Sequence, residues 1–163
     1  MNVNLQVMQI HALGLEDFCE EEYTLIGIHT VLEDYRLAYL LNENLQIRFS
    51  KSQKDLEFEG DKNNGSFSIY NFHSKKYAFD WSLIANISKI EHQAALNEFF
   101  SITETRTYLI PEAKKVDFFI KISGELDAEF VKDTIKKIKK IEQVITSYSI
   151  DKNTLKSKDF LIF

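Results

Sequence analysis

The strongest constraint on the fold is an alternation of apolar and polar side chains that ends near residue 86. The apolar positions, spaced two apart, are Tyr77, Phe79, Trp81, Leu83 and Ala85. Successive side chains of a β-strand point to opposite faces, so this spacing predicts a strand with one buried face. The same alternation recurs over residues 45–49 and 56–59. Together these segments predict a meander of antiparallel strands that covers a core with one face.

Turn residues and short apolar runs predict further strands. The run Asn63-Asn64-Gly65 tolerates positive φ and predicts a hairpin between residues 56–59 and residues 66–72. Strands are also expected over residues 23–30, 105–110 and 116–122, with a short loop between the last two. Residues 88–104 are less regular, but Ser88 with Glu91 three residues later has the form of a helix start, and it predicts a short helix through Glu98.

Two segments carry stronger helix signals. Thr30 followed by Glu33 has the form of a capping box and predicts a well-buried helix to about Glu43, with Val31 and Tyr35 on its apolar stripe. Asp127 is suited to cap a helix that begins at Ala128. The apolar stripe of this second helix is expected at Val131, Ile135, Ile138, Ile141 and Ile145.

The order of these elements predicts an α+β fold. A strand follows the second helix over residues 144–150, so residues 116–150 form a βαβ unit whose outer strands should run parallel. A similar unit is expected around the first helix, from Tyr23 to Phe49. The predicted architecture is a mixed, mostly antiparallel sheet with two main helices packed on one face.

Length and composition favour one domain over residues 1–163. The chain has 44% hydrophobic residues and a net charge of −5, and its one proline and five glycines form no linker. Cys19 is its single cysteine, which excludes an internal disulfide. The first ten residues lack Lys and Arg, and no apolar run is long enough to span a membrane. A cytoplasmic protein without membrane contact is therefore expected.

The motifs of nucleotide-dependent enzymes are missing from the sequence, which contains no Gly-rich phosphate loop and no nucleophile elbow. Its histidines, His11, His29, His73 and His92, show no metal-ligand spacing. His29 is interpreted as a packed residue just before a helix, although pairing with a distant acid stays open. We expect no cofactor, no metal and no catalytic residues.

Two surfaces point to macromolecular partners. Residues 128–144 hold five lysines against three acids, a face that could support weak, salt-sensitive binding to RNA. The 21 aromatic residues exceed what two helices on a small sheet are expected to cover, and an open face would bind a partner. The apolar terminus Phe160-Leu161-Ile162-Phe163 is expected to add an edge strand or to dock in a partner.

Residues 110–118, Ile110-Pro111-Glu112-Ala113-Lys114-Lys115-Val116-Asp117-Phe118, resemble the signature of the bacterial IPExxxVDY family. Phe118 stands where that signature has Tyr, so the ring is kept and the hydroxyl is lost. The resemblance extends to residues 34–39 and 155–158. Since the family has no assigned activity, substrate or cofactor, the resemblance implies a signature and no mechanism.

The signature residues, Ile110, Pro111, Glu112, Val116, Asp117 and Phe118, are interpreted first as structural. Pro111 ends the preceding strand, and the carboxylates of Glu112 and Asp117 would cap backbone donors or pair with a neighbouring lysine. The alternative makes Glu112 and Asp117 an acid/base pair or a divalent-cation site, in an enzyme in which both carboxylates and a histidine share one pocket. We expect a non-catalytic module that binds another protein or itself, with RNA binding through residues 128–144 as a further alternative.

Overall fold

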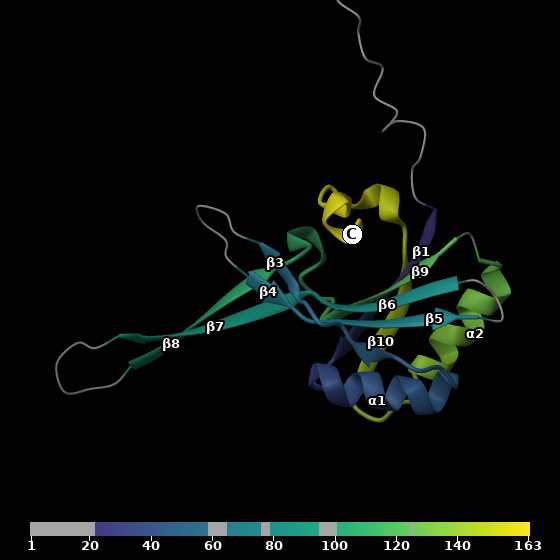
Figure 1. The fold of residues 1–163 in the computed structure, drawn as a ribbon, viewed down its shortest axis with the longest axis horizontal. Coiled ribbons are helices and arrows are strands. Elements are labelled where there is room, and N and C mark those ends of the chain that lie inside the picture. The colour runs from purple at the N-terminus through teal and green to yellow at the C-terminus, as the bar shows by residue number, and fades with distance from the viewer. Residues whose placement is uncertain (1–21, 59–64, 76–78, 95–100, 125) are drawn as a thin grey trace, which may run out of the picture.

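A computed structural model of the chain describes residues 22–58, 65–75, 79–94, 101–124 and 126–163 (Figure 1). Its largest sheet has six strands in the order β10-β1-β9-β6-β5-β2. These strands are β1 (Tyr23–Thr30), β2 (Ser50–Lys51), β5 (Ile69–Ser74), β6 (Phe79–Ala85), β9 (Phe118–Ser123) and β10 (Val144–Ile150). Two hairpins pair β3 (Leu56–Phe58) with β4 (Gly65–Phe67), and β7 (Ile87–Ala94) with β8 (Ser101–Tyr108). The helices are α1 (Asp34–Leu45) and α2 (Ala128–Ile138), with short 3-10 helices η2 (Pro111–Ala113), η3 (Lys152–Thr154) and η4 (Lys158–Leu161).

The α+β class is confirmed, and every pairing between described strands is antiparallel. The βαβ unit takes a split form. Strands β9 and β10 each run antiparallel to β1, which lies between them, so they are parallel to each other without touching. The predicted parallel direction is correct, but the neighbouring strand comes from far earlier in the chain.

Both helices lie on the same side of the large sheet, as predicted (Figure 1). The strand predicted before residue 86 is β6, and its Trp81, Leu83 and Ala85 face this helix side. Buried side chains of the helix side include Ile26, Ile28, Leu37, Leu41, Trp81, Leu83, Ile120 and Ile138. Burial of this apolar area is the main favourable term in folding the domain.

The opposite face of the sheet is covered by the chain itself, which corrects the expectation of an open apolar face. Its core joins the sheet to the η2 segment and to the C-terminal segment through Leu25, Phe67, Ile84, Ile110, Val116, Phe119, Leu155 and Leu161. At Gly27 the packing is close: a Cβ would lie 2.7 Å from Ile150 Cδ1 and 3.1 Å from Val116 Cγ2, so both side chains would have to shift. The terminal residues add no edge strand: η4 buries Leu161 against this face.

The start of α1 differs from the prediction. Glu33, and not Thr30, is the N-cap residue, and it makes no side-chain cap hydrogen bond. Val31 and Tyr35 are exposed, whereas Leu37, Ala38 and Leu41 are buried. The predicted stripe is therefore wrong at Val31, which precedes the helix, and at Tyr35. The strand expected over residues 45–49 is also shorter and later, since it reduces to β2 at Ser50–Lys51.

The segment after residue 86 was predicted wrongly. Residues 87–94 form β7, not a helix, and β7 pairs with β8. The strands predicted over residues 105–110 and 116–122 do not pair with each other across their short loop, because β8 pairs with β7 and β9 pairs with β1 and β6. The hairpin between β3 and β4 is confirmed, but the strand predicted over residues 66–72 divides into β4 and β5. Its turn, residues 59–64, lies outside the described residues.

The second helix starts where predicted and ends at Ile138. Val131, Ile138 and Ile141 are buried, but Ile145 lies beyond the helix and is exposed. Asp127 occupies the N-cap position without a side-chain cap hydrogen bond. Neither helix of the described chain is long and apolar enough to cross a membrane.

Candidate functional site

A cleft of about 940 Å³ opens at the end of the large sheet where β1 ends and β9 begins. One wall is formed by His29, Asp117 and the turn from Thr30 into α1, and the other by residues of the β3–β4 hairpin and the base of the β7–β8 hairpin. His29 and Asp117 stand on this wall because they end β1 and precede β9. The cleft has charged side chains of both signs, including Glu57, Lys89 and Arg106.

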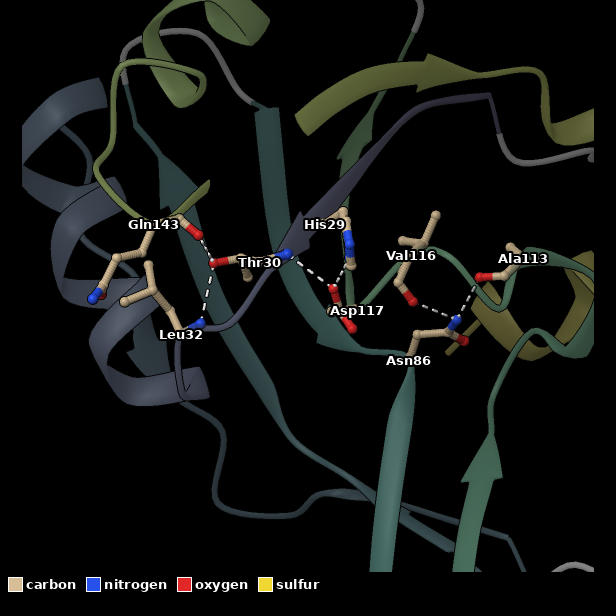
Figure 2. A network of polar contacts seen from close by, with 8 residues as sticks. All are labelled: His29, Thr30, Leu32, Asn86, Ala113, Val116, Asp117 and Gln143. Carbon is tan, nitrogen blue, oxygen red and sulfur yellow. Dashed lines mark hydrogen bonds and ion pairs between the residues drawn. The ribbon is translucent and has the colours of Figure 1, made fainter. Parts of the chain in front are cut away.

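His29 and Asp117 are joined by a side-chain hydrogen bond in this wall. The distance between His29 Nδ1 and Asp117 Oδ2 is 2.5 Å, and the Thr30 amide donates to the same oxygen at 2.8 Å (Figure 2). The His29 side chain is 40% exposed and that of Asp117 is 20% exposed. An ionised carboxylate only accepts, so Nδ1 is the donor of this bond, and in the neutral form of the ring Nε2 keeps a lone pair. Nε2 makes no hydrogen bond to any of the described residues.

Thr30 joins two turns. Its hydroxyl donates to the carbonyl of Gln143 at 2.8 Å and accepts from the Leu32 amide at 3.1 Å (Figure 2). The hydroxyl expected to cap a helix therefore links the β1–α1 turn to the turn before β10. This bond fixes one wall of the cleft.

The loop that carries the signature, residues 110–118, is hydrogen-bonded to Asn86. This residue is fully buried, and it was not singled out from the sequence. Its side-chain amide donates to the carbonyls of Ala113 and Val116 at 3.0 and 2.8 Å, and its side-chain oxygen accepts from the Ile110 amide at 2.8 Å (Figure 2). Its main-chain N–H donates to the Asp117 carbonyl at 2.8 Å. The sequence feature that could have indicated this role is the position of Asn86, a single amide side chain between the apolar residues Ala85 and Ile87.

Glu112 and Asp117 do not share a site. Glu112 accepts from the main-chain N–H and the hydroxyl of Ser157, at 2.7 and 3.1 Å, and it does not line the cleft. Partial burial opposes its ionisation, but the hydrogen bonds from Ser157 and neighbouring amides outweigh burial and lower the pKa of Glu112. Glu112 thus fastens the C-terminal segment, whereas Asp117 fastens His29.

The other signature residues take packing positions. Ile110, Val116 and Phe118 are buried, and Pro111 begins η2 at the surface. Ile110 and Val116 belong to the core beneath the C-terminal segment, and Phe118 belongs to the core beneath the helices.

The remaining candidates lie outside the cleft. His73 is on β5 and pairs with Asp80 at 2.5 Å, with both side chains more than 60% exposed. The lysines of α2, Lys132, Lys136 and Lys137, are exposed, and Lys137 forms an ion pair with Asp133. His11, Cys19 and the side chain of His92 lie outside the described residues. Within those residues, no three His, Cys, Asp or Glu side chains are grouped to hold a metal ion.

The β7–β8 hairpin extends away from the large sheet and forms an arm (Figure 1). The Leu109 amide donates to the Asn86 carbonyl at 2.9 Å, so the residues of β8 with odd numbers direct their backbone groups toward β7. Glu104 and Arg106 therefore direct theirs away from β7. Among the described residues, no strand other than β7 pairs with β8.

The exposed end of this edge is charged. Glu104, Thr105 and Arg106 are all exposed, and Arg106 Nε lies 2.5 Å from Glu104 Oε1. The hydrogen bond from Arg106 lowers the pKa of Glu104. An edge of unpaired backbone donors and acceptors is a template for pairing with another chain.

Comparisons with protein-family models, with curated proteins and with solved structures find no match for this chain. The function is therefore argued from the geometry alone.

Proposed function

We propose that this chain is a protein-binding or self-associating module whose binding surface is the outer edge of β8. The observation that carries the proposal is the β7–β8 arm, which extends away from the large sheet. The outer edge of β8 is exposed, and no other strand of the described chain pairs with it. Two strands alone are marginally stable in water, and a third strand from a partner adds main-chain hydrogen bonds. A surface that gains stability when it is covered suits a binding function.

A proline at the outward-facing edge tests this proposal. Arg106→Pro removes an N–H that points away from β7, a position where an edge strand accepts proline. Tyr39→Ala is the matched control, because Tyr39 is 60% exposed on α1 and belongs to a different surface. We expect the complexes formed by the wild-type chain to be lost with Arg106→Pro and kept with Tyr39→Ala, measured by sedimentation and by retention on the immobilised chain. A strict monomer that retains no partner, or a complex that survives Arg106→Pro, would contradict the proposal.

A second candidate function is catalysis by His29. Asp117 orients its ring, His29 lines the cleft, and Nε2 would act as a general base, an arrangement typical of hydrolytic sites. Nε2 would take a proton from water as the oxygen attacks an ester carbonyl, and would return it to the leaving alkoxide. In this form the enzyme hypothesis needs His29 and Asp117 but not Glu112.

Hydrolysis of 4-nitrophenyl acetate tests the second candidate. His73 is the matched control, since it also pairs with an aspartate at 2.5 Å but lies outside the cleft. Catalysis predicts a rate that falls with His29→Gln and stays unchanged with His73→Gln. Equal losses from both variants would mark ordinary surface imidazole chemistry and end this candidate.

A further inference from the structure

We infer that the partner at the outer edge of β8 is a second copy of this chain, paired antiparallel around a twofold axis through Thr105. The inference rests on the proposed function and names its partner. It follows from the direction of the β8 backbone, from the order of residues along β8 and from the charges at its exposed end.

The sequence of β8 is chemically symmetric about Thr105. Residues 102–108 read Ile-Thr-Glu-Thr-Arg-Thr-Tyr, so equal steps from Thr105 meet an acid and a base, then Thr and Thr, then Ile and Tyr. An isologous dimer places residue 105 − n opposite residue 105 + n of its copy. In this register, threonine stands opposite threonine, and an acid stands opposite a base.

The backbone geometry allows this register. Glu104 and Arg106 direct their N–H and C=O groups outward, so Glu104 and Arg106 of the second copy would exchange both main-chain hydrogen bonds. The twofold axis generates two such pairs: Glu104 of each copy lies opposite Arg106 of the other. Thr105 then faces its own copy as the close pair without main-chain hydrogen bonds, in which Cα atoms lie about 4.5 Å apart.

The charges favour the same arrangement. Within one chain, the register of the arm sets Lys89 directly opposite Arg106, and cations in opposed positions destabilise a hairpin. A second copy would give each Arg106 a glutamate directly across the new strand pair. The side chains of Arg106 and Glu104 are 56% and 36% exposed, so both are accessible to a partner.

Pairing would also complete the arm. Two arms joined through β8 make a four-stranded sheet, which is larger than the two-stranded hairpin that is marginally stable alone in water. The edge of the large sheet at β10 is a poorer place for such pairing. Asp117 N–H donates to Ile28 C=O, so Ile28 faces β9, and Ser147 opposite Ile28 directs its backbone away from β1. Ser147 is nevertheless fully buried by its own chain.

Cysteine cross-linking tests the register. With Cys19→Ser as background, Thr105→Cys puts two sulfur atoms across the axis within the Cα range of a disulfide. Thr107→Cys is the matched control on the same strand, because its copy would lie about 13 Å away along the strand. We expect oxidation to yield a disulfide dimer with Thr105→Cys and monomer with Thr107→Cys. Dimer from both variants, or from neither, overturns the inference.

Charge reversal tests the pairing in solution. Glu104→Arg sets like charges across both symmetric pairs and is expected to raise the dimer dissociation constant about tenfold. The double variant Glu104→Arg, Arg106→Glu restores opposite charges and should recover the wild-type constant in sedimentation experiments. A wild-type chain that is monomeric at every concentration, or a double variant that dimerises no better than Glu104→Arg, overturns the inference. The proposed function fails separately, when Arg106→Pro changes no complex with any protein.

Discussion

His29 Nδ1 and Asp117 Oδ2 lie 2.5 Å apart although the two residues are 88 positions apart in the chain. The bond joins the end of β1 to the residue that precedes β9, and the Thr30 amide shares the same oxygen. It therefore closes the wall of the cleft and fixes the direction of the imidazole.

Removal of Asp117 should cost more stability than removal of His29. Asp117→Ala leaves the Thr30 amide without an acceptor in a partly buried place, and we expect a loss of about 2 kcal/mol in the free energy of unfolding. His29→Ala leaves a carboxylate that still accepts from Thr30, so its cost is expected to be about 1 kcal/mol or less. Denaturant unfolding of both variants measures the difference. Equal losses would show that the Thr30 amide finds another acceptor.

Asn86 should be the most sensitive polar position of the signature loop. Asn86→Ala leaves the Ile110 amide and the carbonyls of Ala113 and Val116 without partners, and the expected loss is about 3 kcal/mol. Asn86→Asp should lose more at neutral pH, because a carboxylate would face two carbonyl oxygens in a buried place. Chemical unfolding at pH 7 gives the order of the two variants. An aspartate variant as stable as the alanine variant would contradict the assigned direction of these bonds.

The spacing of apolar residues along the sequence correctly predicted the strands and helices in which one face is buried. In β6, Trp81, Leu83 and Ala85 alternate because one face meets the helices, and in α2 Val131 and Ile138 repeat because one stripe meets the sheet. Such periods can be read from neighbouring residues alone. These periods were therefore enough to predict the α+β class and the packing of both helices on one side of the sheet.

Elements decided by distant partners could not be predicted in this way. The Ser88–Glu91 spacing imitates a helix start, but pairing with residues 101–108 makes the segment a strand. Thr30 imitates a helix cap, yet its hydroxyl donates to Gln143, 113 residues away. Nor does spacing show that Glu112 binds Ser157 while Asp117 binds His29. Each outcome depends on a contact that forms only after the chain has folded.

The contact between Glu112 and Ser157 should be released by acid. Because hydrogen bonds lower the pKa of Glu112, its ionised form stabilises the attached C-terminal segment above the usual pKa of a glutamate, about 4.3. This contribution is lost as the pH falls through the lowered pKa. We expect the NMR signal of the Ser157 amide to move with a midpoint below that value.

Glu112→Gln should abolish this acid transition, because its side chain carries no charge to titrate. Asp159→Asn is the control, since Asp159 lies in the same segment but Ser157 donates to Glu112 and not to the Asp159 side chain. A transition that persists in Glu112→Gln and disappears in Asp159→Asn would show that Asp159, and not Glu112, is the titrating carboxylate.

Tyr70 should ionise at a higher pH than an ordinary tyrosine. Its burial, followed by the negative charge of Asp34, raises the pKa of Tyr70 to about 12. The folded state then holds a proton that the unfolded chain releases near pH 10, so stability falls as the pH rises from about 10 to about 12. Tyrosinate absorbance during an alkaline titration should contain a late step that Tyr70→Phe removes. Asp34→Asn should shift this step toward pH 10 without reaching it, because burial remains, and a step that Asp34→Asn leaves in place would refute the contribution of the carboxylate.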